Sequence, residues 1–176
     1  MNNFEYAYPQ TEAEAIDLLN DYPTETAILA GGTDLISLMS RDVLAPQRVV
    51  DIKQIESLRG ITSVEEGLLI GALTTLEELN DHPLMSQYHS LLQVVEETRS
   101  IQIQSMGTLG GDLCHLPNCW YYRNGYGLFG TENGESLVTE GENRYHAILG
   151  NESAAKYVSA SRFAPPLIAW GAKIRI

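Results

Sequence analysis

The sequence predicts a mixed α/β fold, and three observations support this prediction. A strand, a glycine turn, a helix and a second strand follow one another near the N-terminus, a β-hairpin pattern lies further along, and helix signals occur on both sides of that hairpin. We expect two subdomains: a β-α-β subdomain over residues 1–55 with a first Gly-Gly loop, and a larger mixed α/β portion over residues 56–176. With 176 residues and 44% apolar content, the chain is long enough to bury a sizeable core.

The N-terminal unit is expected to begin with a helix over residues 11–20. Thr11 and Glu14 form a capping-box pattern, and apolar residues follow at helical spacing. The next elements are a short buried strand, a short helix and a second strand, predicted over residues 26–30, 35–41 and 48–52. A glycine pair separates the first of these strands from its helix.

The larger portion begins with a hairpin, because two β-prone runs over residues 60–64 and 68–71 flank a polar glycine turn. Thr75 and Glu78 are placed to cap a short helix after it. An amphipathic helix is expected from about residue 91 to 99. An apolar run over residues 101–106, which we expect to be extended, then leads into a second glycine turn.

The polar segment over about residues 118–157 is rich in Gly, Asn and Glu and shows no sustained periodicity, so we interpret it as an insertion or long loop. Pro165 and Pro166 favour the start of a helix, and Gly171 favours its end. Residues 173–176 are predicted to begin a strand. The chain ends at an apolar residue without a polar tail, so the larger portion looks incomplete at its C-terminal end.

Composition excludes some classes of partner. The net charge of −12 and the pI near 4.6 argue against nucleic acid and anionic membrane surfaces, which require clustered Lys and Arg. No basic leader with an apolar run and no apolar stretch of membrane-spanning length is present, which favours a cytoplasmic protein. Cys114 and Cys119 do not form the framework of a secreted disulfide scaffold.

The first chemical signal is a loop in which a strand runs into two glycines, a hydroxyl and a carboxylate before a helix. Glycine permits close approach of a phosphate, consecutive backbone N–H groups can surround an anion, and a hydroxyl adds a donor. The alternative is an ordinary tight turn with an N-cap. The candidate binding residues of this first loop are Leu29, Ala30, Gly31, Gly32, Thr33, Asp34 and Leu35.

A second loop repeats this chemistry with Thr108, Gly110, Gly111 and Asp112. Two such loops are able to hold a diphosphate from opposite sides. The alternative, two unrelated turns, is weakened because both loops are expected to follow extended apolar runs and both combine glycines with a hydroxyl and an acid.

Four blocks in this order resemble the flavoprotein subunits of molybdenum hydroxylases, such as xanthine dehydrogenase, carbon monoxide dehydrogenase and 4-hydroxybenzoyl-CoA reductase. The blocks are the first loop, residues 49–52, residues 69–76 and residues 104–113. The resemblance covers essentially the whole chain. It implies that segments 30–35 and 108–112 hold the diphosphate and ribityl region of FAD.

The same resemblance implies a role and partners. Electrons from a 2Fe-2S subunit, supplied in turn by a molybdenum-cofactor subunit that hydroxylates the substrate, pass through FAD to NAD or another acceptor. FAD carries the redox chemistry, and the protein binds and orients it. The chain is thus expected to be an FAD-dependent oxidoreductase subunit that is not active on the substrate alone.

Three departures limit what the resemblance implies. In one branch of the family the insertion supplies four cysteines to an iron-sulfur cluster, but here only Cys119 matches, so we expect no metal site and an insertion peripheral to the flavin. Arg162 stands where the family has an Asp that contacts FAD. The chain also stops at Ile176, which resembles a truncated product or a fragment of a longer subunit.

Other motifs lack support. Residues 125–130 match G-x-G-x-x-G but lack the flanking strand and helix, and no P-loop pattern is present. The histidines are scattered, and no nucleophile, base and orienting group can be assembled, so we assign no catalytic residue. The rival to an FAD-binding electron-transfer module is a truncated, non-catalytic remnant that no longer holds FAD and serves at most to bind a partner.

Overall fold

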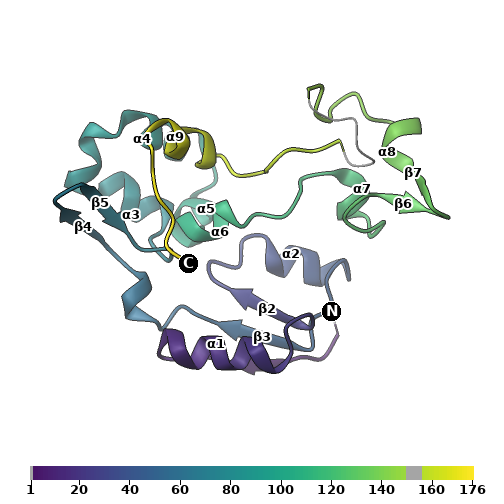
Figure 1. The fold of residues 1–176 in the computed structure, drawn as a ribbon, viewed down its shortest axis with the longest axis horizontal. Coiled ribbons are helices and arrows are strands. Elements are labelled where there is room, and N and C mark those ends of the chain that lie inside the picture. Colours follow the sequence, from purple (N-terminus) through teal and green to yellow (C-terminus); the bar gives the residue numbers. More distant parts are fainter. Residues whose placement is uncertain (1, 150–155) are drawn as a thin grey trace.

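The computed structural model describes residues 2–149 and 156–176 and shows the predicted mixed α/β fold (Figure 1). Three parallel strands form a sheet in the order β1-β3-β2: β1 (Glu5–Ala7), β2 (Thr26–Leu29) and β3 (Arg48–Asp51). The predicted strands β2 and β3 are confirmed. The sequence did not reveal β1, because three residues are too few to show an alternating pattern.

Helix α1 (Glu12–Asp21) connects β1 to β2, and helix α2 (Leu35–Ser40) connects β2 back to β3. These two crossovers run in opposite directions across the sheet. Since parallel crossovers are right-handed, the two helices must lie on opposite faces, as Figure 1 shows. Helix α2 therefore faces the rest of the molecule.

Thr11 caps α1 as predicted, but Glu14 bonds the amide of Gln10, one residue before the N-cap, and so the capping box is only half formed. The backbone N–H of Glu14 donates to Thr11 Oγ1 at 3.2 Å, and the Glu14 carboxylate accepts from the backbone N–H of Gln10 at 2.8 Å. Two amides at the helix N-terminus thus gain partners that the helix itself cannot supply.

The carboxylate of Asp51, at the end of β3, is buried between Tyr6 and Lys53. Tyr6 Oη donates to it, and Lys53 Nζ lies 2.6 Å from Asp51 Oδ2. Burial on its own raises the pKa of Asp51, but hydrogen bonds from Lys53 and Tyr6, together with the Lys53 charge, hold this pKa below its ordinary value.

We expect Asp51→Asn to lower the free energy of unfolding at neutral pH and to make it less sensitive to acid. A carboxyl whose pKa is lower in the folded state stabilises the fold above its unfolded pKa, and this contribution is lost as the pH falls through the folded pKa. Urea unfolding from pH 7 down to about pH 3 measures the difference between parent and variant. A difference that does not shrink toward acid contradicts this assignment.

The predicted hairpin is confirmed as antiparallel strands β4 (Ile61–Val64) and β5 (Gly67–Ile70). It packs with α3 (Leu76–Asp81), α4 (His89–Glu97) and α6 (Leu109–Leu113). Thr75 and Glu78 form the predicted capping box of α3, and α4 begins and ends two residues earlier than expected. Short 3₁₀ helices precede β4 and α4, at Glu56–Leu58 and Pro83–Gln87. The buried core of this layer consists of Ile61, Leu76, Leu79, Met85, Leu91, Val95, Leu109 and Phe163.

The expectation of an extended run over residues 101–106 is wrong, because this segment is helix α5 (Ile101–Met106). Ser100 Oγ caps it by accepting from the backbone N–H of Ile103 at 3.4 Å. Ser105 Oγ donates to the Ile101 carbonyl at 3.0 Å, one turn earlier. The apolar residues of this run suggested an extended segment, but capping and packing against α3 determine the local structure.

The insertion contains more regular structure than predicted. Its described residues form α7 (Trp120–Arg123), the two-stranded hairpin of β6 (Thr131–Glu132) and β7 (Glu135–Ser136), and α8 (Leu137–Glu140). Figure 1 shows this group at the far end of the molecule from the β4–β5 hairpin. A second buried cluster joins it to α2 through Leu38, Cys119, Tyr122 and Val138. The insertion is therefore packed onto α2.

Helix α9 (Ala164–Ala169) contains the proline pair in its first turn and ends before Gly171, as predicted. The strand expected over residues 173–176 is absent; that segment is irregular and exposed. Within the described residues, no helix is both long and apolar enough to cross a lipid bilayer.

Candidate cofactor-binding site

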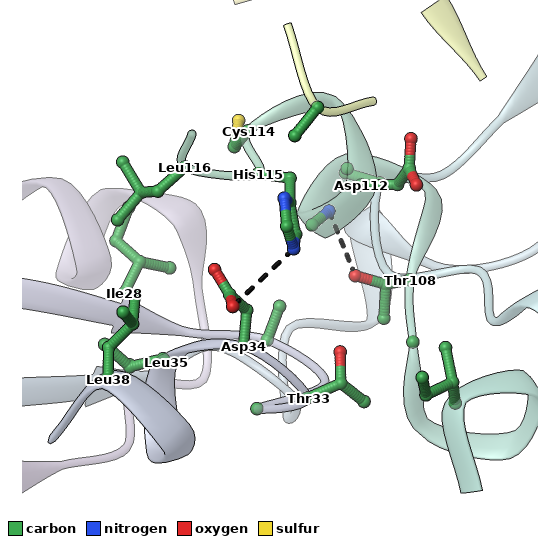
Figure 2. A pocket seen from close by; sticks show the side chains of 18 of the residues that line it. Ile28, Thr33, Asp34, Leu35, Leu38, Thr108, Asp112, Cys114, His115 and Leu116 are labelled. Carbon is green, nitrogen blue, oxygen red and sulfur yellow. Dashed lines mark hydrogen bonds and ion pairs between the residues drawn. The ribbon is translucent and has the colours of Figure 1, made fainter. Parts of the chain in front are cut away.

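A cavity of about 760 Å³ lies between β2 with the first loop on one side and α5, α6 and residues 114–116 on the other. Figure 2 shows Thr33, Asp34, Thr108, Asp112 and His115 around it. Every site residue predicted from the sequence lines this cavity except Leu29 and Gly31. The fold thus brings the two loops, more than 70 residues apart in sequence, to one site.

The first loop presents free backbone donors to the cavity. Gly32 has a φ of +72°, which glycine adopts without strain. Among the described residues, the backbone N–H groups from Gly32 to Leu35 have no hydrogen-bond acceptor. The Thr33 side chain is exposed at the same place (Figure 2). Consecutive free amides and a hydroxyl are the donors that a phosphate group binds.

Gly31 serves a different purpose, because its Cα packs against the backbone of Met106. A Cβ at this position would lie 1.8 Å from the Met106 carbonyl oxygen. Only glycine allows this approach of the first loop to the end of α5. The contact fixes one wall of the cavity against the other.

The second loop does not offer the same row of free amides as the first. It forms the first turn of α6, where Gly111 N–H donates to Thr108 Oγ1 at 3.1 Å and Asp112 N–H to the Thr108 carbonyl at 2.9 Å. Gly110 N–H donates to the Ala72 carbonyl at 2.8 Å. The glycine at 110 is required because a Cβ there would lie 2.8 Å from that of Ala72.

Asp112 is likewise engaged by the protein. Its Oδ1 accepts from Ser161 Oγ and from the backbone N–H of Phe163 at 3.2 Å. These bonds hold the segment before α9 against α6. Arg162, between the two bonded residues, lines the cavity and donates from Nη1 to Thr98 Oγ1 at 3.0 Å. A cation therefore lies on this wall of the cavity.

Asp34 makes no capping hydrogen bond to α2 and instead contacts two residues that sequence reasoning missed. Both guanidinium Nη atoms of Arg123 donate to its carboxylate, Nη2 at 3.2 Å to Oδ2. His115 Nε2 faces Asp34 Oδ1 at 3.6 Å (Figure 2). Since Arg123 belongs to the insertion, the insertion contacts the first loop at Asp34.

Two buried polar atoms of cavity-lining residues have no hydrogen-bond partner within the described part of the chain: Thr26 Oγ1 and His115 Nδ1. Buried polar groups in native proteins are almost always paired. Both atoms are closed to solvent, so neither is open to the cavity in this structure.

No metal centre is formed by the residues that the structure describes, where no three His, Cys, Asp or Glu side chains converge. Cys119 Sγ lies 3.1 Å from His146 Nε2, and Cys114 is exposed. This pair offers too few ligands for a structural metal site.

Comparison with known proteins identifies the ligand class. The family described as "FAD binding domain in molybdopterin dehydrogenase" matches residues 2–176. The chain belongs to this family. As a member of an FAD-binding family it is a flavoprotein domain, in agreement with the cofactor implied by the family resemblance.

This FAD-binding domain is 37% identical over 115 residues to the nicotinate dehydrogenase FAD-subunit of Eubacterium barkeri, covering 64% of this chain and 39% of that protein. It is 33% identical to the carbon monoxide dehydrogenase medium chain of Hydrogenophaga pseudoflava, covering 64% and 39%. A solved carbon monoxide dehydrogenase from the same organism superposes with a TM-score of 0.62 at 32% identity, covering 65% of this chain and 40% of that one. The domain thus spans about two fifths of each relative.

The cavity suits FAD by chemistry and size. Its volume falls in the upper part of the usual range for cofactor sites, about 300–1,000 Å³. The free amides of the first loop match the acceptor oxygens of a diphosphate. Both aliphatic and polar residues form the walls.

Proposed function

We propose that this domain binds FAD in the described cavity, with the diphosphate at the free amides of the first loop. The observation that carries the proposal is the run of unpaired N–H groups from Gly32 to Leu35 on the wall of a cofactor-sized cavity. Residues 29–35, Thr108, Gly110, Gly111 and Asp112 then form or shape the binding site. The second loop contributes walls and Thr108 rather than a second set of amides.

We further propose that residues 1–55 and 56–176 are two subdomains with FAD between them. The cavity has β2 and α2 on one side and α5 and α6 on the other, which supports this division. No acid or base of the chain is assigned a catalytic role, because FAD itself supplies the electron transfer. The protein binds the cofactor, orients it and limits its contact with water.

As part of an oxidoreductase, the domain would pass electrons from a 2Fe-2S partner, supplied by a molybdenum-cofactor subunit, through FAD to NAD or another acceptor. The names of the relatives, which are FAD subunits or medium chains of dehydrogenases, support a role as one subunit of a dehydrogenase. Flavin absorbance of the purified protein tests FAD binding directly. A colourless protein that added FAD does not reconstitute favours the rival hypothesis of a remnant that no longer holds FAD.

Two glycine substitutions, one in the first loop and one in the insertion, provide a sharper test. We expect Gly32→Ala to weaken FAD binding about tenfold or more, because the new methyl group and the altered φ displace the amides that hold the diphosphate. Fluorescence titration with FAD measures the dissociation constant. Thermal melting without FAD measures how far the substitution destabilises the fold.

Gly134→Ala is the matched control. Gly134 also has a positive φ, +86°, and open space around its Cα, so alanine there carries a similar backbone strain of about 1–2 kcal/mol. It lies between β6 and β7 and does not line the cavity. If the two variants melt alike and bind FAD alike, the first loop does not hold the diphosphate.

A further inference from the structure

The residues around Asp34 present an electrostatic problem for any phosphate ligand. Its carboxylate belongs to the first loop, directly after the free amides of Gly32 and Thr33, and lines the cavity. The chain as a whole has a net charge of −12. A bare carboxylate at this position would repel a diphosphate through a partly desolvated medium, where charges interact more strongly than in water.

The structure supplies a cation at this carboxylate. Arg123 is only 16% exposed in its side chain and Asp34 25%, so solvent screens the pair weakly. The guanidinium contacts both carboxylate oxygens, a two-point geometry that lysine does not offer. His115 Nε2 faces the same carboxylate at 3.6 Å.

The position of Arg123 is itself fixed by the protein. Its Nε donates to the Pro117 carbonyl at 2.9 Å and its Nη2 to the Leu116 carbonyl at 3.0 Å. The adjacent Tyr122 is buried in the cluster that joins the insertion to α2. The arginine is therefore held in place before any ligand arrives.

We propose that Arg123, supplied by the insertion, makes the first loop compatible with the FAD diphosphate by neutralising Asp34, and that Asp34 itself is not an acceptor for FAD. This inference rests on the proposed function. It makes Arg123 a positioning and charge-compensating residue of the cofactor site, with no direct contact to the cofactor required.

A double-mutant cycle tests the proposal by FAD dissociation constants for the parent, Arg123→Gln, Asp34→Asn and the double variant. We expect Arg123→Gln to weaken FAD binding about tenfold, because it exposes the diphosphate to an uncompensated carboxylate. Asp34→Asn should bind FAD at least as tightly as the parent. In the Asp34→Asn background, Arg123→Gln should raise the FAD dissociation constant by less than about threefold.

The competing explanations give different results. If Asp34 accepts a hydrogen bond from FAD, or if the pair merely anchors the insertion, Asp34→Asn weakens binding as much as Arg123→Gln does. If Arg123 supports FAD binding only by holding the 116–117 carbonyls, Arg123→Gln weakens FAD binding by the same factor with Asp34 and with Asn at position 34. Either result overturns the proposal. Should Arg123→Gln fail to fold, the affinity of Asp34→Asn alone decides.

Arg144→Gln is the matched control, since Arg144 is an exposed arginine of the insertion that pairs with Glu142. It should leave FAD affinity within about twofold of the parent. Melting temperatures without FAD accompany each variant. A parent protein that binds no FAD refutes the proposed function. If the parent binds FAD but the four dissociation constants do not follow the expected pattern, only the role of Arg123 is refuted.

Discussion

Gly31→Ala is expected to lower the free energy of unfolding by about 3 kcal/mol, one of the two largest effects we predict. The new Cβ would lie 1.8 Å from the Met106 carbonyl oxygen and 2.8 Å from its carbonyl carbon. Both are backbone atoms at the end of α5, so relief requires the first loop and α5 to separate. Urea unfolding measures the loss.

The cavity depends on the same contact, so we expect Gly31→Ala to lose FAD binding as well. Gly60→Ala is the control, because Gly60 has a φ of +85° and nothing within 4 Å of the new Cβ. It suffers backbone strain of about 1–2 kcal/mol without a clash. Equal destabilisation by the two variants would mean that the first loop is not packed against Met106.

The second large effect is expected for Phe163→Ala, with a loss of about 3–5 kcal/mol in the free energy of unfolding. Phe163 is 1% exposed and packs in the core of the hairpin and helices α3, α4 and α6. Its backbone N–H also donates to Asp112. The empty space left by alanine cannot be filled without moving α6, which carries the second loop.

Phe129→Ala provides the comparison, since Phe129 is 54% exposed in the insertion and should cost less than about 1 kcal/mol. Phe163→Leu should fall between the two because it retains part of the buried apolar volume. A small loss for Phe163→Ala would show that the segment before α9 is not part of this core.

Local patterns predicted the elements that depend on neighbours in sequence. The N-cap Thr11 of α1, the capping box of α3 and the polar turn of the β4–β5 hairpin each act within a few residues, and each was confirmed. The prediction of an extended run over residues 101–106 was wrong, because the isoleucines of this segment do not line a sheet. Ile101 and Ile103 remain 75% and 38% exposed, and the Ser100 cap fixes a helix instead.

The site was predicted only in part, because some of its contacts join residues that are distant in sequence. The residue types of the first loop indicated an anion-binding turn, and the structure leaves its amides unpaired. The partner of Asp34 lies 89 residues further along, in a segment without periodicity, so no local pattern indicated the pair. Likewise, the Ala72 carbonyl that occupies the Gly110 amide belongs to a distant turn.

Because Arg123 compensates the charge of the Asp34 carboxylate, the order of synthesis on the ribosome affects the site. At a translation rate of about 5–20 residues per second, the arginine is added roughly 4–18 s after the aspartate, given the 89 residues between them. Helix α1 and the β4–β5 hairpin involve only nearby residues and need not wait for it. In a nascent chain that ends before residue 123, the Asp34 carboxylate of the first loop has no compensating cation. We therefore expect FAD to bind only after the insertion has emerged.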